Sequence, residues 1–299
     1  GERSMSTTRL HGCGTALATP FTQSGVLDED ALRQFVEWQV RDGVQFVVPC
    51  GSTGEAATLS VQEHRRVVEI TVEQVNGRVP VMAGAGSNDT QRAILLSRES
   101  QAAGATHLLH VTPMYNKPPQ RALIAHFRAI ADACTLPIVL YNVPGRTAVN
   151  LEARTCLTLA DDPRFVGVKE ASANLAQMVD ILRDRPDHFS VLSGDDGFTL
   201  AVMAHGGDGV ISVISNVVPR MVAALCSAMQ RGDLAGARLL ERRMAPIIHA
   251  AFVESNPIPI KAMLHLQRRM QNVLRLPLVP LSDVHGDTVR HALATADSL

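Results

Sequence analysis

The chain has 299 residues, 46% of them hydrophobic, with a mean hydropathy of +0.08, which is enough sequence for one large core or a large domain with a small extension. Its net charge of −1 comes without a basic tract for nucleic acid or an anionic membrane surface, and no apolar run approaches the roughly 20 residues that span a bilayer. The N-terminus lacks an apolar signal core, and five scattered cysteines without a CxxC pair favour reduced thiols over disulfides or a zinc site.

Short apolar runs recur through the first three quarters of the chain, and we predict that they are strands. Most are continuous rather than alternating, as expected of parallel strands that are buried on both faces. In chain order the runs cover residues 15–18, 46–49, 79–83, 107–111, 138–141, 165–168, 190–192 and 209–213.

Helical patterns separate these runs. Acidic residues open the first pattern at residues 28–30, and Ser60 to Glu63 has the spacing of a capping box at the start of the second. The predicted helices cover about residues 28–43, 60–75, 89–104, 119–134, 151–160, 174–183, 196–205 and 219–231.

Eight strand–helix units in order predict an α/β fold, a (β/α)8 TIM barrel. An open doubly wound sheet is the competing layout, but no GxGxxG follows the first strand. Beyond about residue 232 the strand pattern stops, and segments 234–252, 258–269 and 282–296 predict a C-terminal helical annex. We therefore expect a tag remnant and lead-in at residues 1–13, with Met5 as the native start, a catalytic barrel at 14–232 and a helical region at 233–299.

Lys169 follows the buried run at residues 165–168. A lysine at the carboxyl end of an interior strand is unusual, because burying an ammonium group is costly. A desolvated neutral amine attacks ketones, so Lys169 is a candidate Schiff-base nucleophile. On this run alone, a lysine that simply ends its strand in solvent is the favoured interpretation.

Polar residues gather after the other runs, where a TIM barrel places its active site. Ser52 and Thr53 lie between glycines and either form a carboxylate cradle or belong to an ordinary turn. The only two tyrosines, Tyr115 and Tyr141, follow the fourth and fifth runs, where a phenol can move protons or cap the core. Arg146 offers a fork suited to a carboxylate, or is a solvated loop residue.

The last two runs add weaker candidates. Gly194 lies in a Ser-Gly-Asp-Asp-Gly segment that could hold an ion, although helix capping is the better interpretation. Ile211 could form part of the pocket wall through its backbone carbonyl. His107 and His110 are three apart on one strand and should point to opposite faces, and HxH and HExxH motifs are absent. We therefore expect no catalytic metal, which leaves covalent amine chemistry as the simplest way to activate a carbonyl.

Six segments occur in an order that resembles the pyruvate-dependent Schiff-base aldolase superfamily, which contains N-acetylneuraminate lyases and dihydrodipicolinate synthases. The likeness covers about residues 14–294, annex included. Arg146 favours the dihydrodipicolinate synthase branch, because in that family this position receives the carboxylate of aspartate semialdehyde. The segments are GSTGE, VTPMYNKP, YNVPGRT, GVKEAS, SGDD and GVISV.

The resemblance implies that Lys169 forms an imine with pyruvate, whose enamine attacks L-aspartate-4-semialdehyde to give 4-hydroxy-tetrahydrodipicolinate. This would be a lyase of lysine and diaminopimelate biosynthesis. Tyr141 would act as general acid and base, and Thr53 would link it to Tyr115 of a neighbouring subunit. Ser52 and Thr53 would hold the pyruvate carboxylate. The substrate-binding set is then Ser52, Thr53, Arg146, Ile211 and Gly194.

The expected partners follow from the same resemblance. They are the two substrates and further copies of the chain, in a homodimer or a homotetramer built as a dimer of dimers. We expect no nucleic-acid or membrane partner, no cofactor beyond the lysine imine, and a cytoplasmic location.

Lysine-inhibited relatives bind lysine at a dimer interface, and His64 and Asn88 agree with that site. Val61 replaces a histidine, Arg92 replaces a glutamate that pairs with the lysine ammonium group, and Met114 replaces a tyrosine. Because Arg92 should repel a cationic ligand, we expect weak or absent inhibition by lysine.

Two alternatives remain open. One is a lyase of the same superfamily that cleaves a 2-keto-3-deoxy sugar acid, or a related oxo acid, to pyruvate. The other is a non-catalytic barrel that binds a small carboxylate and regulates a partner. Arg146 and Tyr115 weigh against the first, and the joint presence of Lys169, Tyr141, Thr53 and Tyr115 weighs against the second.

Overall fold

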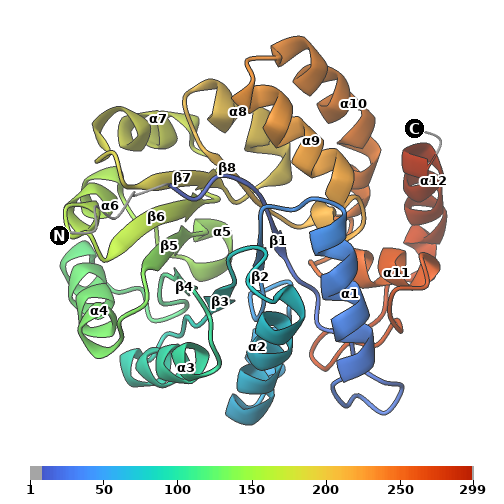
Figure 1. Cartoon of the computed structure of the whole chain (residues 1–299), viewed down its shortest axis with the longest axis horizontal. Helices are drawn as coiled ribbons and strands as arrows, with labels where there is room; N and C mark the ends of the chain where they lie inside the picture. Colours follow the sequence, from blue (N-terminus) through green and yellow to red (C-terminus); the bar gives the residue numbers. More distant parts are fainter. Residues whose placement is uncertain (1–8, 298–299) are drawn as a thin grey trace.

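The computed structural model describes residues 9–297 and contains a parallel eight-stranded sheet that curls into a barrel (Figure 1). The strand order is β2-β1-β8-β7-β6-β5-β4-β3, and a parallel bridge between Val47 and Val81 joins the two ends. The predicted TIM barrel with a helical annex is confirmed. Residues 1–8 of the expected tag remnant and lead-in lie outside the described part.

The strands run at regular intervals along the chain, as the apolar runs predict. They are β1 (Gly12–Ala16), β2 (Phe46–Val48), β3 (Met82–Gly84), β4 (His107–Val111), β5 (Ile138–Asn142), β6 (Phe165–Glu170), β7 (Ser190–Ser193) and β8 (Gly209–Ser212).

Helices cover the outside of the barrel and continue into the annex. They are α1 (Glu29–Arg41), α2 (Val61–Val75), α3 (Thr90–Ala102), α4 (Gln120–Ala133), α5 (Pro144–Thr147), α6 (Ala153–Ala160), α7 (Leu175–Asp184), α8 (Thr199–Ala204), α9 (Pro219–Gln230), α10 (Leu234–Ala250), α11 (Ile258–Leu266) and α12 (Gly286–Asp297). None of these helices is both long enough and apolar enough to cross a membrane.

Local sequence signals account for several of these boundaries. The capping box predicted at Ser60 is present: its hydroxyl accepts from the Glu63 N–H, and the Glu63 carboxylate accepts from the Ser60 N–H. The first strand was predicted to begin at residue 15, which is wrong, since β1 begins at Gly12. A Cβ at Gly14 would lie 2.0 Å from the Phe46 ring, so glycine makes room there for a core side chain.

Two hydrophobic layers hold the barrel together. Its interior is filled from several strands by side chains that include Phe46, Met82, Leu109, Leu192 and Ile211. A larger cluster packs the outer faces of the strands against the surrounding helices. Because both faces of each strand are buried, the runs read as continuous apolar sequence rather than as an alternating pattern.

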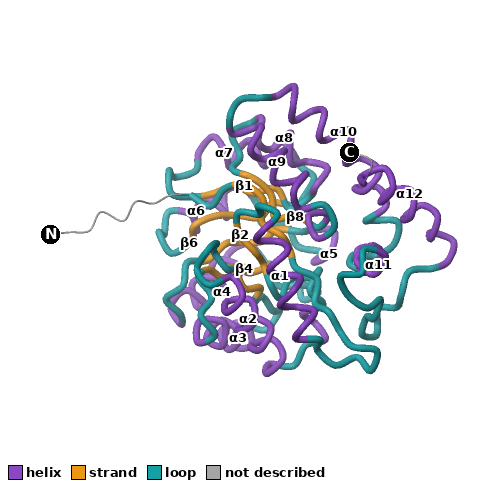
Figure 2. Tube along the Cα trace, turned by 45° about the vertical axis from the view of Figure 1, so that its right-hand side comes forward, coloured by secondary structure: helices purple, strands orange, loops and turns teal. Residues whose placement is uncertain are grey.

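The annex helices α10, α11 and α12 lie together on one side of the barrel (Figures 1 and 2). Helix α10 packs against α9, the last helix of the barrel, and also against α12. The segment between α10 and α11 returns to the mouth of the barrel, which brings annex residues to the same end as the strand termini.

The buried histidine His110 predicts a fold that is sensitive to acid. His110 on β4 is fully buried, its Nε2 lies 2.9 Å from the Ser97 Oγ of α3, and burial together with nearby His126 lowers its pKa to about 3. The unfolded chain binds a proton at this residue near pH 6.5. The stability that neutral His110 contributes is therefore complete above about pH 6.5 and is lost as the pH falls towards 3.

We expect the melting temperature of the wild-type protein to fall between pH 7 and pH 4, and the fall to be smaller in His110→Gln, because glutamine does not titrate. His249→Gln, at an exposed position of α10, is the matched control and should follow the wild type. Circular dichroism melts across this pH range measure the difference. Equal slopes in all three proteins would show that His110 does not cause the acid sensitivity.

Candidate active site

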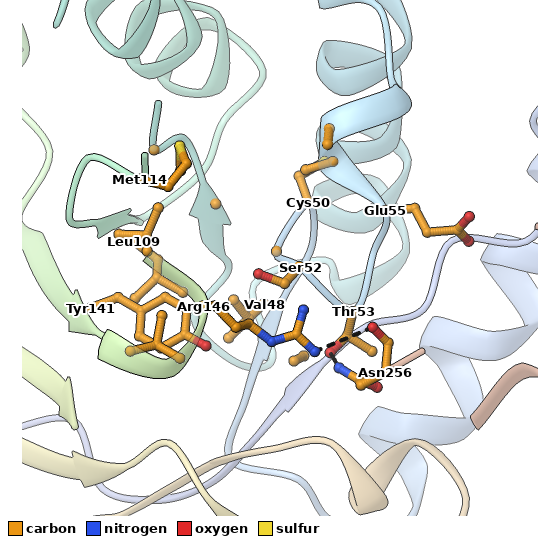
Figure 3. Close-up of a pocket in the computed structure, with 18 of the residues that line it drawn as sticks. Val48, Cys50, Ser52, Thr53, Glu55, Leu109, Met114, Tyr141, Arg146 and Asn256 are labelled. Carbon is orange, nitrogen blue, oxygen red and sulfur yellow. Dashed lines mark hydrogen bonds between the residues drawn. The ribbon is translucent and has the colours of Figure 1, made fainter. Parts of the chain in front are cut away.

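A cavity of about 770 Å³ opens at the carboxyl ends of the strands. Strand ends, the loop at residues 51–55, helix α5 and the segment between α10 and α11 line it (Figure 3). Polar residues that follow the strands therefore line a cavity, at the end of the barrel where TIM-barrel enzymes have their active sites.

Lys169 is the next-to-last residue of β6 and lines this cavity, with only 6% of its surface exposed. Its Nζ lies 4.0 Å from the centre of the Tyr141 ring, because β5 and β6 pair in a register that sets Tyr141 opposite Lys169. Within residues 9–297 no carboxylate pairs with the Lys169 amine. This lysine is thus buried, unpaired and next to a phenol.

The chain contains only two other lysines, and neither is placed as Lys169 is. Lys117 is exposed in the loop after β4. Lys261 is fully buried in α11, with its Nζ 2.5 Å from Glu55 Oε2, and burial lowers its pKa to about 8. Lys169 is therefore the one lysine whose amine reaches the cavity without an acidic partner in the described part of the chain.

Gly194, at the end of β7, makes room for the Lys169 side chain. A Cβ at this position would lie 3.0 Å from Lys169 Cγ and 2.8 Å from the Ala171 side chain. Glycine here lets the lysine extend along the cavity floor. The adjacent acidic residues behave as the capping interpretation predicts, since the Asp195 carboxylate accepts from the Gly197 N–H at the start of a short 3-10 helix.

The hydroxyls of the loop after β2 lie on the opposite wall. Thr53 is buried, whereas Ser52 is exposed, and both line the cavity. The Thr53 Oγ1 accepts a hydrogen bond of 2.8 Å from the side-chain amide of Asn256. No hydrogen bond links Thr53 to Tyr141 or to Tyr115 in the described residues, so the expected relay is not assembled within one chain.

Arg146 lies on α5, a short helix that the sequence did not indicate. Its guanidinium reaches across the cavity mouth towards Thr53 and Asn256 (Figure 3), and Nη2 donates to the Asn256 carbonyl at 3.4 Å. No acidic side chain pairs with Arg146 within residues 9–297, so its charge is available to an anion. This is the arrangement that carboxylate recognition requires.

Tyr115 does not line the cavity of its own chain. It is 87% exposed, has a backbone φ of +76°, and donates its N–H to the Thr147 carbonyl at 3.2 Å. The Asn88 and Asn116 amides hold its loop through bonds to the carbonyls of Met114 and Asn88. Tyr115 is thus a large exposed side chain on a backbone in the left-handed region, which is uncommon for a residue other than glycine.

Ile211 is not among the residues that line the cavity. It is fully buried in the interior layer, and Val213, two residues further on, lines the cavity instead. The predicted opposite orientations of His107 and His110 agree with the packing: His110 contacts α3 outside the barrel. In the described residues no three His, Cys, Asp or Glu side chains lie close enough together to hold a metal ion.

The cavity carries an excess of positive charge. Arg146, Lys169 and Arg92 line it without acidic partners in the described residues. Two carboxylates also line it: Glu55 pairs with Lys261, and Asp195 accepts from the Gly197 N–H. Cations in a hollow of low polarity raise the local concentration of anions. The site is therefore suited to small substrates that carry carboxylates.

Asn256 is the site residue that sequence reasoning missed. The segment Asn-Pro-Ile-Pro indicated only a break between annex helices. Its contact with Thr53 joins residues 203 apart in the chain, and no local pattern records such a distance.

The chain is similar in sequence to proteins of one known family. The sequence profile described as "Dihydrodipicolinate synthetase family" matches residues 9–296. A protein of Nitratidesulfovibrio vulgaris called 4-hydroxy-tetrahydrodipicolinate synthase is 50% identical over 96% of this chain and 99% of its own.

Two solved structures are similar throughout. One is a chloride-inhibited dihydrodipicolinate synthase of Acinetobacter baumannii complexed with pyruvate, 38% identical, with a TM-score of 0.94 over 97% of this chain and 99% of the other. The other is a synthase of Cyanidioschyzon merolae with lysine bound, 37% identical, with a TM-score of 0.94 over 98% of this chain and all of the other.

Proposed function

Since the chain belongs to the dihydrodipicolinate synthetase family, we propose that its cavity condenses pyruvate with L-aspartate-4-semialdehyde to 4-hydroxy-tetrahydrodipicolinate, with Lys169 as the nucleophile. The chain is a lyase of lysine and diaminopimelate biosynthesis. The observation that carries the proposal is the unpaired amine of Lys169, buried beside Tyr141 in a cation-lined cavity.

The first half of the reaction activates pyruvate. The Lys169 amine adds to the keto carbon, and loss of water leaves an imine between the two. Removal of a proton from the methyl group then gives an enamine, because the imine nitrogen accepts the electron pair. A covalent lysine imine supplies the activation, so we propose that the reaction needs no metal or other cofactor.

The second half joins the substrates. The enamine carbon attacks the aldehyde of L-aspartate-4-semialdehyde, the new alkoxide takes a proton, and the amine of this substrate closes the ring as it displaces Lys169. Tyr141 is the proposed acid and base, since its ring lies against the lysine amine. Thr53 would pass protons between Tyr141 and Tyr115 of a neighbouring subunit.

The placement of Tyr115 supports an oligomer. Its exposed side chain and strained backbone support a role in the cavity of a second copy. We therefore propose a homodimer or a dimer of dimers. All five cysteines are unpaired, which is typical of a reducing compartment, and we propose a cytoplasmic location.

The carboxylates of the two substrates have separate receptors in this proposal. Ser52 and Thr53 hold that of pyruvate, with Gly194 opposite and the backbone near Ile211 and Val213 closing the wall. Arg146 holds that of the semialdehyde. Cleavage of a 2-keto-3-deoxy sugar acid is the less favoured reaction, because the relatives carry the synthase name and Arg146 is free for a second anion.

A coupled assay tests the proposal. Pyruvate and L-aspartate-4-semialdehyde are supplied together with dihydrodipicolinate reductase, which reports the product as loss of NADPH. Turnover is expected with this pair and not in a retro-aldol assay on 2-keto-3-deoxy sugar acids. The reverse pattern would favour the lyase. If the protein showed neither activity, both reactions would be ruled out.

Lysine should inhibit this enzyme weakly. The cavity continues past His64 to Arg92, whose charge repels the cationic groups of lysine. We expect the rate in the coupled assay to change little at millimolar lysine, and to become more sensitive in Arg92→Glu, with Arg92→Ala as the control. Strong inhibition of the wild type at sub-millimolar lysine would contradict this prediction.

A further inference from the structure

Asn256 touches two residues of the proposed site from outside the barrel sequence. It lies between α10 and α11, is only 6% exposed, and lines the cavity. Its side-chain amide donates to Thr53 Oγ1 at 2.8 Å, and its carbonyl accepts from Arg146 Nη2 at 3.4 Å (Figure 3). One annex residue therefore lies between the receptor of pyruvate and the receptor of the second substrate.

The direction of the Asn256–Thr53 bond has a chemical consequence. Because Asn256 supplies the hydrogen, the Thr53 oxygen acts as acceptor and its own O–H remains free to donate. The hydroxyl has no second partner within residues 9–297. Asn256 thus fixes where the oxygen lies and leaves its O–H available to a molecule in the cavity.

A buried ion pair fixes the same two segments at a second point. Lys261 Nζ lies 2.5 Å from Glu55 Oε2, with both side chains out of contact with solvent, and it also donates to the Val273 carbonyl at 2.8 Å. The other oxygen of Glu55 accepts from the Arg275 N–H at 3.0 Å. The loop is therefore held at Thr53 and Glu55 by residues 256 and 261 of one annex segment.

Such an ion pair fixes the positions of its two residues more than it stabilises the fold. Taking two charges out of water is costly, and a well-packed apolar pair of the same shape is often at least as stable. A charged pair, unlike an apolar one, fixes a distance and an orientation. Catalytic groups need supporting contacts of this kind, because a misplacement of about 1 Å can cost about 10²-fold in rate.

We propose that Asn256, held in place by the Lys261–Glu55 ion pair, is a positioning residue for the Thr53 hydroxyl, so that the helical annex completes the active site of its own barrel. The inference rests on the role proposed above for Thr53. It assigns a function in catalysis to residues that otherwise look like connections between helices.

A double-mutant cycle tests this inference. Asn256→Ala should lower kcat about 10-fold to 100-fold with a smaller change in the KM for pyruvate, because one hydrogen bond that orients a catalytic group is lost. Thr53→Val should lower it further, and adding Asn256→Ala to Thr53→Val should cause no additional loss. Asn272→Ala, which removes an annex asparagine that does not line the cavity, is the matched control.

Two readouts separate this inference from the proposed function. The coupled assay reports the whole reaction, and exchange of the pyruvate methyl protons in D2O, followed by NMR, reports imine and enamine formation without the second substrate. A wild type with neither activity would overturn the proposed function. Losses that multiply in the double mutant, or an Asn256→Ala enzyme as fast as wild type, would overturn the positioning role.

The ion pair needs a paired variant, because Lys261→Met alone leaves Glu55 buried without its partner and can unfold the protein. Glu55→Gln with Lys261→Met removes both charges and keeps both shapes. We expect this enzyme to retain the wild-type circular dichroism spectrum and to lose about 10-fold in kcat. A folded paired variant with wild-type kcat would show that the ion pair does not support the site.

Discussion

Replacing Lys169 with alanine should abolish turnover, with a loss of at least about 10³-fold in the coupled assay, because no other amine can form the imine in this cavity. Lys117 is exposed on a loop, and Lys261 is buried against Glu55. The barrel should remain folded, since the variant removes a side chain without an acidic partner from a cavity wall.

Lys117→Ala is the matched control for this experiment, because it removes an exposed lysine from the loop after another strand, β4. It should keep the wild-type rate and the wild-type circular dichroism spectrum. Turnover by Lys169→Ala within about 10-fold of wild type would show that Lys169 is not the nucleophile.

Arg146→Ala should impair use of the second substrate far more than use of pyruvate. A charge-assisted pair with a carboxylate contributes about 1.5–3 kcal/mol, so kcat/KM for L-aspartate-4-semialdehyde should fall about 10-fold to 100-fold or more. Exchange of the pyruvate methyl protons should change little, because that step needs only Lys169 and its neighbours. The two measurements on one variant therefore separate the two receptors.

Arg92→Ala is the control for charge, since it removes a cation from the same cavity at its other end. It should leave both measurements close to wild type. Equal losses of exchange and of semialdehyde use in Arg146→Ala would instead assign Arg146 to pyruvate binding or to the structure of the loop.

The fold was predictable because short stretches of sequence determine its strands and helices. Each strand is a continuous apolar run, and signals such as the Ser60 capping box mark where helices begin. Lys169 was less predictable, because its own run favoured a lysine that ends the strand in solvent, whereas the structure buries the residue in the cavity. Boundaries failed where packing decided them: β1 begins early because Gly14 makes room for Phe46.

The other part of the site depends on contacts between distant segments. Nothing in the sequence near Asn256 indicates that it reaches Thr53, or that Lys261 pairs with Glu55. The short helix that carries Arg146 was also missed, since four residues are too few for a helical pattern. Thr53 was expected to join two tyrosines, yet within the single chain it is bound to the annex.

The most direct test of the account is to find where pyruvate attaches. The protein is incubated with pyruvate, reduced with borohydride, digested and mapped by mass spectrometry, and only three lysines and the amino terminus can carry the adduct. We predict a reduced pyruvate adduct on the peptide that contains Lys169 and none on those that contain Lys117 or Lys261. An adduct confined to another amine, or no adduct with active enzyme, would contradict the account.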